Sequence, residues 1–366
     1  MGEALSAPAD RLGDRGRPPG QAPTFAALDL GTNNCRLLIA TPSTDGFRVV
    51  DAFSRIVRLG EGLSQTGELS ERAMERAILA LGVCADKIAR RGALQVRAVA
   101  TQACRSAANG RRFVDEAARR TGLHLNIISP REEAQLSVAG CLNLLDRSAR
   151  AALVLDVGGG STELSWLDLT AAGLDVDPRR QAHWRLPIKA WLSAPVGVVT
   201  LAERFPEGEV HDPGRFRAMV EAMKVHIADF TRADDLRPAF ACGDAHLVGT
   251  SGAITSLAGL HLGLARYDRS QVDGLWMTRA QCEAAATRLA ALSASERAAQ
   301  PCIGPDRADL VLAGAAILQA VQELWPCDRV RVADRGLREG LLLSMMSQQG
   351  RRGRSRARGR RSGRPR

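Results

Sequence analysis

Two short stretches of sequence decide the fold, because each places an aspartate and glycine between two apolar runs. They are Phe25-Ala-Ala-Leu-Asp-Leu-Gly-Thr-Asn-Asn34 and Ala152-Leu-Val-Leu-Asp-Val-Gly-Gly-Gly-Ser-Thr-Glu163. Each predicts a strand, a tight turn and a returning strand, which together form a β-hairpin with a carboxylate at its bend. Glycine lets the backbone approach a ligand closely, so consecutive N–H groups at the bend can point at an anion. Two such hairpins indicate a pair of similar domains that close on phosphate groups.

Most of the candidate site follows from these two bends. Mg²⁺ prefers oxygen ligands, so we expect Asp156 and Glu163 to hold a divalent cation. For Asp29 and Asp156 an alternative is an aspartate that only caps its own turn. The residues predicted to bind phosphate at the bends are Asp29, Gly31, Thr32, Asn33, Asn34, Gly158, Gly159, Gly160, Ser161 and Thr162.

Composition places the chain among ordinary globular proteins with room for two domains. It has 366 residues, of which 45% are hydrophobic and 25% charged. The net charge of +10 comes mostly from residues 351–366, which hold nine arginines and no acid and leave 41 basic and 40 acidic residues elsewhere. The high isoelectric point therefore does not predict a nucleic-acid-binding fold. The arginine-rich tail either binds polyanions such as polyphosphate or RNA by counterion release, or is solvated without a partner.

The cysteine pattern and the apolar runs predict a cytoplasmic protein without membrane insertion. Eight cysteines are scattered singly with no C-x-x-C pair, which argues against a zinc site and a disulfide framework and favours a reducing compartment. Residues 1–23 lack the apolar core of a secretory signal, and the apolar stretch at 310–318 is too short to span a bilayer.

Strands and helices alternate in both halves, so we expect two α/β domains. Ser70 predicts the start of a helix that ends at Gly92, because serine caps helix N-termini and glycine ends helices. Further helices are predicted at 111–120, 132–145, 214–232, 279–292 and 308–324, and a last helix follows Gly340 and runs to about Gln348. The predicted organisation is a disordered leader (1–23), an N-terminal domain (24–148), a second domain (149–349) whose last helix packs back on the first, and a disordered arginine-rich tail (350–366).

An ordered series of motifs resembles the exopolyphosphatase and guanosine pentaphosphate phosphatase (Ppx/GppA) family of the actin and sugar-kinase superfamily. The likeness runs through nearly all of residues 25–347. It implies two actin-like (ribonuclease-H-like) α/β domains around a phosphate-binding cleft. The matching segments, beside the two bends, are Val57–Leu63, Ala100–Arg105 with Asn109, Ile127–Ser129, Glu132–Ala134, Gly249–Gly252, Arg307–Asp309 and Gly336–Gly340.

The resemblance also implies roles for residues outside the bends. Glu133 matches the catalytic glutamate of the family, a general base; the alternative is that Glu132 and Glu133 merely complement the dipole of a helix N-terminus. Arg105 matches an arginine that holds the phosphate chain, or else forms a surface ion pair. Ser251 and Gly252 line the cleft or form a plain tight turn. We expect Arg338 and Glu339 to form a structural pair near the hinge.

The function implied is Mg²⁺-dependent hydrolysis of the terminal phosphoanhydride of inorganic polyphosphate, releasing orthophosphate. Guanosine pentaphosphate is an alternative substrate, because it shares that terminal bond. Two other classes stay open: an ATP-dependent kinase of the same superfamily, and a non-catalytic sensor of polyphosphate or alarmone. The resemblance also implies a homodimer.

Overall fold

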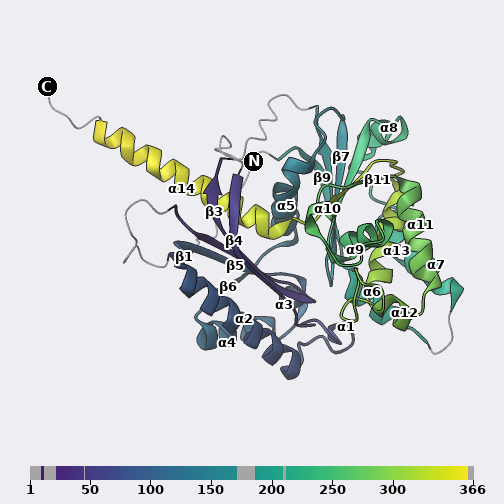
Figure 1. The fold of residues 1–366 in the computed structure, drawn as a ribbon, viewed down its shortest axis with the longest axis horizontal. Helices are drawn as coiled ribbons and strands as arrows, with labels where there is room; N and C mark the ends of the chain where they lie inside the picture. Colours follow the sequence, from purple (N-terminus) through teal and green to yellow (C-terminus); the bar gives the residue numbers. More distant parts are fainter. Residues whose placement is uncertain (1–9, 12–21, 45, 171–185, 209–211, 362–366) are drawn as a thin grey trace.

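In the computed structural model, two six-stranded sheets stand side by side, and the description covers residues 10–11, 22–44, 46–170, 186–208 and 212–361 (Figure 1). In the N-terminal sheet three strands form an antiparallel meander, and the first of them pairs in parallel with the next strand along. The strands of this sheet are β1 (Asp10–Arg11), β2 (Phe25–Leu30), β3 (Asn34–Ser43), β4 (Gly46–Ile56), β5 (Gln95–Ala100) and β6 (Leu125–Ile127).

The C-terminal sheet repeats this plan. The order β9-β8-β7-β10-β12 matches β4-β3-β2-β5-β6, with an antiparallel meander followed by two parallel pairings in both sheets. The predicted pair of ribonuclease-H-like α/β units is therefore confirmed. The strands are β7 (Ala151–Val157), β8 (Thr162–Asp168), β9 (Ile188–Ala194), β10 (Ala245–Thr250), β12 (Val330–Ala333) and an added edge strand β11 (Trp276–Met277).

The helices cover both sheets. The helix predicted after Ser70 is confirmed as α2 (Glu71–Arg91): the Ser70 hydroxyl accepts a hydrogen bond from the Ala73 N–H at 3.2 Å, and Gly92 ends the helix with φ 56°. The other helices are α1 (Leu63–Thr66), α3 (Gln102–Ser106), α4 (Gly110–Thr121), α5 (Pro130–Cys141), α6 (Val198–Arg204), α7 (Pro213–Lys224), α8 (Arg237–Ala241), α9 (Gly252–His261), α10 (Arg269–Val272), α11 (Arg279–Ala291), α12 (Ala294–Ala298), α13 (Val311–Leu324) and α14 (Leu337–Arg361).

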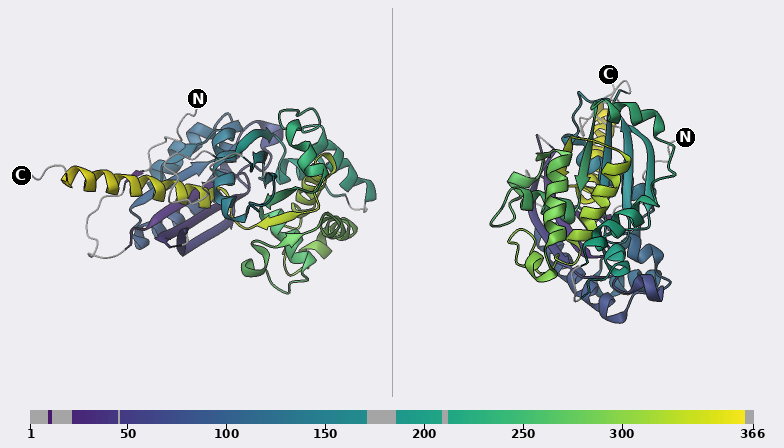
Figure 2. Two further views of the ribbon diagram at one scale, coloured as in Figure 1. Left: turned by 90° about the horizontal axis from the view of Figure 1, so that it is seen from above. Right: turned by 90° about the vertical axis from the view of Figure 1, so that its right-hand side faces the viewer.

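Two of these helices, α5 and α14, join the sheets. On one face of the N-terminal sheet lie α2 and α4, and on the other α14 buries Leu341 and Leu342 against the strands. Helix α5 contacts α14 and also packs against β7 and β8 of the second sheet. Figures 1 and 2 show α14 starting at the junction of the lobes, crossing the N-terminal sheet and projecting beyond it. The predicted return of the last helix to the first half is thus observed, whereas the division at residue 149 stays a prediction.

Several predicted helix boundaries were wrong. Helix α5 begins at Pro130, because Ser129 caps it and proline suits the first turn, and it ends at Cys141, where a 3₁₀ turn follows. Helix α7 stops at Lys224, just before a Val-His-Ile run of weak helix formers. Helix α14 continues to Arg361, since arginine is a good helix former.

The remaining predictions about the ends and the cysteines have mixed outcomes. All eight cysteines are free thiols, as predicted. Most of the predicted leader and residues 362–366 of the tail lie outside the described residues; within the leader, β1 pairs with β5. Among the described residues no helix has both the length and the apolarity to cross a membrane.

Candidate phosphate-binding site

The two bends meet face to face between the lobes. Each closes in the same way: the Gly31 N–H donates to the Asn34 carbonyl and the Gly158 N–H to the Ser161 carbonyl, both at 2.9 Å. A Cβ atom added to Gly159 would lie 3.1 Å from the Asn33 backbone nitrogen. Because such a contact is too tight for a side chain, glycine is required where the second bend approaches the first.

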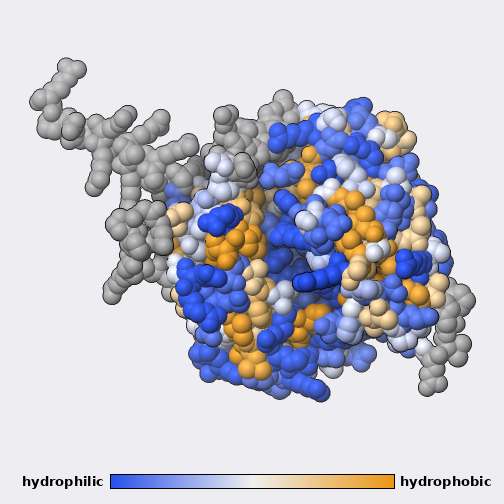
Figure 3. Space-filling view, viewed as in Figure 1, coloured by the Kyte–Doolittle hydropathy of each residue, from blue (hydrophilic) through white to orange (hydrophobic). Residues whose placement is uncertain are grey.

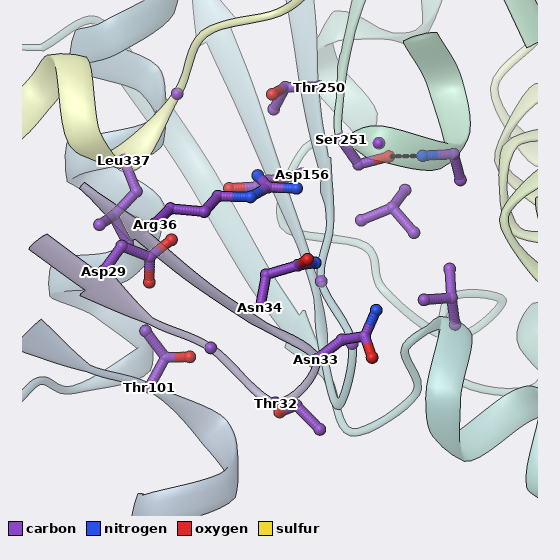
Figure 4. A pocket seen from close by; sticks show the side chains of 18 of the residues that line it. Asp29, Thr32, Asn33, Asn34, Arg36, Thr101, Asp156, Thr250, Ser251 and Leu337 are labelled. Carbon is purple, nitrogen blue, oxygen red and sulfur yellow. Dashed lines mark hydrogen bonds between the residues drawn. The ribbon is translucent and has the colours of Figure 1, made fainter. Parts of the chain in front are cut away.

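A single cavity between the lobes gathers nearly all of the predicted residues. Figure 4 shows the first bend, Asp156 and Ser251 around it. The first turn of α9 also faces this cavity, since Gly252 and Ala253 line it, and a helix N-terminus favours anions. The predicted site residues that line the cavity are Asp29, Gly31, Thr32, Asn33, Asn34, Glu133, Asp156, Gly158, Gly159, Gly160, Ser161, Glu163, Ser251 and Gly252.

Glu133 reaches the cavity from the first turn of α5 and is 8% exposed. Burial and the neighbouring charges of Glu163 and Asp156 raise its pKa well above the usual range, while Arg105 opposes that rise. Glu132 does not line the cavity and pairs instead with the buried Arg97. The geometry therefore separates the two glutamates, and of the two only Glu133 lines the cavity.

Asp156 and Glu163 stand directly opposite each other on β7 and β8. Burial, followed by nearby carboxylates, raises the pKa of Asp156 to about 6 and that of Glu163 to about 7. The Ser137 hydroxyl donates to Asp156 and the Ser193 hydroxyl donates to Glu163, but neither carboxylate has an ion pair among the described residues. The charges of Arg36 near Asp156 and of Arg105 near Glu163 oppose the rise in these pKa values without forming an ion pair with either carboxylate.

This donor set fits a divalent cation that is shared with substrate. In the described part of the chain no three histidine, cysteine or acidic side chains come close enough to form a metal site by themselves. Mg²⁺ commonly binds through one or two carboxylates, several waters and the phosphates of the substrate. Asp156 is half-buried and Glu163 is buried, and both line the cavity without an ion pair to the described residues, so this donor set meets that requirement.

Four arginines at the cavity were not predicted as site residues, and one of them, Arg335, pairs with Asp273. Arg36 on β3 stands opposite Asp29, in the register position that Glu163 occupies opposite Asp156. A Cβ atom on Gly252 would lie 3.6 Å from Arg36 Nη2 and 4.0 Å from Arg307 Cζ, so both guanidinium groups reach the α9 N-terminus. The guanidinium groups of Arg36, Arg307 and Arg338 make no hydrogen bond or ion pair with the described residues, although all three residues line the cavity.

Two buried polar atoms of the first bend also lack partners. Thr32 Oγ1 and Asn33 Oδ1 have no hydrogen bond in the structure, although both side chains are buried at the cavity wall. An unpaired buried polar group is costly, so such atoms point to a ligand that completes them. Ser251 differs, because its hydroxyl already accepts hydrogen bonds from Ala253 and Ile254 N–H as the α9 cap.

The structure corrects three of the predicted side-chain roles. Thr162 lies outside the cavity lining, and its hydroxyl donates to the Val196 carbonyl at 2.6 Å, because alternate residues of β8 face opposite sides. Arg105 is also outside the lining: it donates to Glu133 Oε2 at 3.1 Å and to the Ile128 carbonyl at 2.7 Å. The expected Arg338–Glu339 pair is absent, since Glu339 accepts from the Gly336 N–H at 2.8 Å.

The fold and the cavity define an α/β protein built to hold phosphate groups between two similar lobes. A model of the Ppx/GppA phosphatase family matches residues 38–349, and the chain belongs to that family. It is therefore a hydrolase of phosphoanhydride bonds by class, which disfavours the kinase alternative.

Two relatives illustrate the breadth of the family. The chain is 29% identical to exopolyphosphatase 2 of Mycobacterium tuberculosis, over 87% of this chain and 98% of the relative. It is 28% identical to the guanosine-5'-triphosphate,3'-diphosphate pyrophosphatase of Vibrio vulnificus, over 90% of this chain but 60% of that protein. The chain therefore corresponds to the full length of the first relative and to part of the second.

Two solved structures share the fold of this chain. An exopolyphosphatase-like protein superimposes with a TM-score of 0.75 at 29% identity, over 88% of this chain and 98% of the other. The Ppx/GppA family member of Aquifex aeolicus superimposes with a TM-score of 0.69 at 26% identity, over 90% of this chain and 99% of the other.

Proposed function

We propose that this protein is an exopolyphosphatase, which hydrolyses the terminal phosphoanhydride of inorganic polyphosphate and releases orthophosphate. The single observation that carries the proposal is the convergence of two glycine bends, buried carboxylates and unpaired arginines on one cavity. Coverage of nearly the whole M. tuberculosis exopolyphosphatase 2 favours polyphosphate over guanosine pentaphosphate. The nucleotide remains the alternative substrate, because its terminal bond is the same.

The terminal phosphoryl group binds at the two bends. Backbone N–H groups of the bends, with Thr32 and Ser161, hold its oxygens, and Arg36 and Arg338 neutralise charge. Phosphoryl transfer needs mainly positioning and charge stabilisation, so fixed donors of this kind can supply much of the reduction in the activation barrier.

Glu133 then acts as the general base. Its carboxylate accepts a proton from the attacking water, the water oxygen bonds to the terminal phosphorus, and the bond to the bridging oxygen breaks. Orthophosphate and a chain shorter by one phosphate leave. Arg105 donates a hydrogen bond to the Glu133 carboxylate and so fixes its orientation, which makes Arg105 a positioning residue.

Asp156 and Glu163 would hold a divalent cation, and their carboxylate oxygens favour Mg²⁺. The cation would neutralise negative charge on the substrate phosphates and on the two carboxylates. We further propose that the protein forms a homodimer in the cytoplasm and that the arginine-rich segment after residue 350 binds polyanions, polyphosphate first and RNA as the alternative.

The test substitutes Glu133→Gln, which keeps the shape of the side chain and removes the base. Orthophosphate release from polyphosphate should fall by about 10²–10⁴-fold, while polyphosphate binding persists. Glu132→Gln is the matched control and should retain turnover within a few-fold, because Glu132 faces Arg97. Wild-type turnover in Glu133→Gln would refute the role of Glu133, and binding without hydrolysis in the wild type would indicate a sensor.

A further inference from the structure

A second hollow adjoins the cavity, and arginine dominates its lining. Residues of both lobes form it, and we call it the arginine groove; its arginines are Arg55, Arg58, Arg72, Arg76 and Arg307. Asn34, Ile56 and Arg307 line the groove and the cavity alike, so the two spaces lie next to each other. Figure 3 shows the molecule hollowed between its lobes, with hydrophilic residues around the depression.

The charge of the arginine groove is only partly compensated. Arg76 pairs with Glu61 at 2.7 Å, and Arg58 pairs with Asp309 across the lobes at 3.0 Å. The side chains of Arg55, Arg72 and Arg307 make no hydrogen bond or ion pair with the described residues, although the Arg55 guanidinium lies 5.3 Å from the centre of the Phe53 ring. Asp306 adds one further carboxylate to the lining, so arginine remains in excess. Unpaired guanidinium groups that face a common hollow create a positive potential, which attracts an anion.

The residues that line the groove favour a polyanion without bases. We propose that the arginine groove binds the stretch of a polyphosphate chain that follows the terminal phosphates held at the bends. This inference rests on the proposed function and adds where the rest of the substrate lies. Guanidinium forks match phosphate oxygens well. Base binding usually relies on stacking against aromatic rings, and Tyr267 is the one aromatic side chain in the groove lining.

Length dependence of the Michaelis constant tests the proposal. The double variant Arg55→Glu/Arg72→Glu should raise KM for polyphosphate of about 100 phosphates at least about fivefold, since two cations become anions along the chain. The KM for tripolyphosphate, which ends within the cavity, should rise far less. Equal rises for both substrates, or none for the long chain, would overturn the groove assignment.

A matched control makes the same change of charge elsewhere. Arg90→Glu/Arg111→Glu replaces two exposed arginines that line neither hollow. Arg90 lies 18 residues along α2 from Arg72, about 27 Å away. The control should leave both KM values near wild type. If it raises the long-chain KM as much as the groove variant, the effect is general electrostatics and the proposal fails.

Binding without turnover separates this proposal from the proposed function. In the Glu133→Gln background, fluorescently end-labelled polyphosphate should bind more weakly when Arg55 and Arg72 are replaced, and the salt dependence of binding should also decrease. An equal loss for guanosine pentaphosphate would show a nucleotide site and refute the chain path. If the wild type binds polyphosphate through the groove but releases no orthophosphate, the proposed function is wrong and the groove assignment stands. If it releases orthophosphate but its binding does not depend on the groove arginines, the groove assignment is wrong and the proposed function stands.

Discussion

At the scale of single residues, four of the carboxylates that line the cavity have raised pKa values and differ in what surrounds them. Burial raises the pKa of Asp29, Glu133, Asp156 and Glu163, so each holds its proton more tightly than a free side chain. Only Glu133 has a guanidinium within hydrogen-bond distance, because Arg105 donates to it. Perturbed acids of this kind are typical of catalytic sites.

The contact between Arg105 and Glu133 predicts a pH effect. The Arg105 charge lowers the Glu133 pKa, so Arg105→Gln should raise that pKa further. A base with a higher pKa loses its proton only at higher pH, and the acid limb of kcat/KM should therefore move up by about one pH unit. Rates of orthophosphate release between pH 5 and 9 measure this shift.

Arg105→Lys is the control, because it keeps the positive charge and should return the acid limb towards its wild-type position. A direct phosphate contact by Arg105 would give another result. In that case Arg105→Gln would raise KM at every pH and leave the acid limb in place.

At the scale of elements, the junction of α5 and α14 depends on glycine. A Cβ atom on Gly140 would lie 1.9 Å from the Gly336 carbonyl oxygen, and one on Gly340 would lie 2.1 Å from the Leu136 carbonyl oxygen. These are backbone atoms that cannot swing aside. Since α5 carries Glu133 and α14 begins at the cavity, this close packing fixes the position of the base relative to the bends.

We expect Gly140→Ala to destabilise the protein by about 1–3 kcal/mol, because the added methyl group forces the two helices apart. Gly82→Ala in α2 is the matched control: nothing lies within 4 Å of its added Cβ, and it should stabilise the helix by about 0.5–1 kcal/mol. Urea unfolding of both variants measures the two effects. A Gly140→Ala protein as stable as the wild type would contradict the tight junction.

The elements also show what sequence patterns could and could not predict. The bends and the caps of α2 are local features, so the residues at those positions were enough to predict them. Arg36 was missed because it begins an apolar run, and only the pairing of β3 with β2 brings it opposite Asp29. Arg307 and Arg338 reach the cavity through tertiary packing, which no local pattern encodes. The direction of the Thr162 side chain could not be predicted from its motif, and its hydroxyl donates to the Val196 carbonyl instead of lining the cavity.

At the scale of the whole molecule, the two lobes meet on both sides of the cavity. Helices α5 and α14 join them on one side. On the other, Arg58 pairs with Asp309, and Glu203 accepts hydrogen bonds from the Gly62 N–H at 3.0 Å and the Ser64 hydroxyl at 2.7 Å. The substrate site is thus enclosed by contacts between lobes, and its charges belong to both.

Orthophosphate release by the wild-type protein from long-chain polyphosphate, with Mg²⁺ present and with Mg²⁺ chelated, most directly tests whether the site between the lobes hydrolyses polyphosphate. We expect steady release of single phosphates that requires the divalent cation, and little release from ATP. No release from polyphosphate or guanosine pentaphosphate under either condition would contradict the proposed hydrolysis.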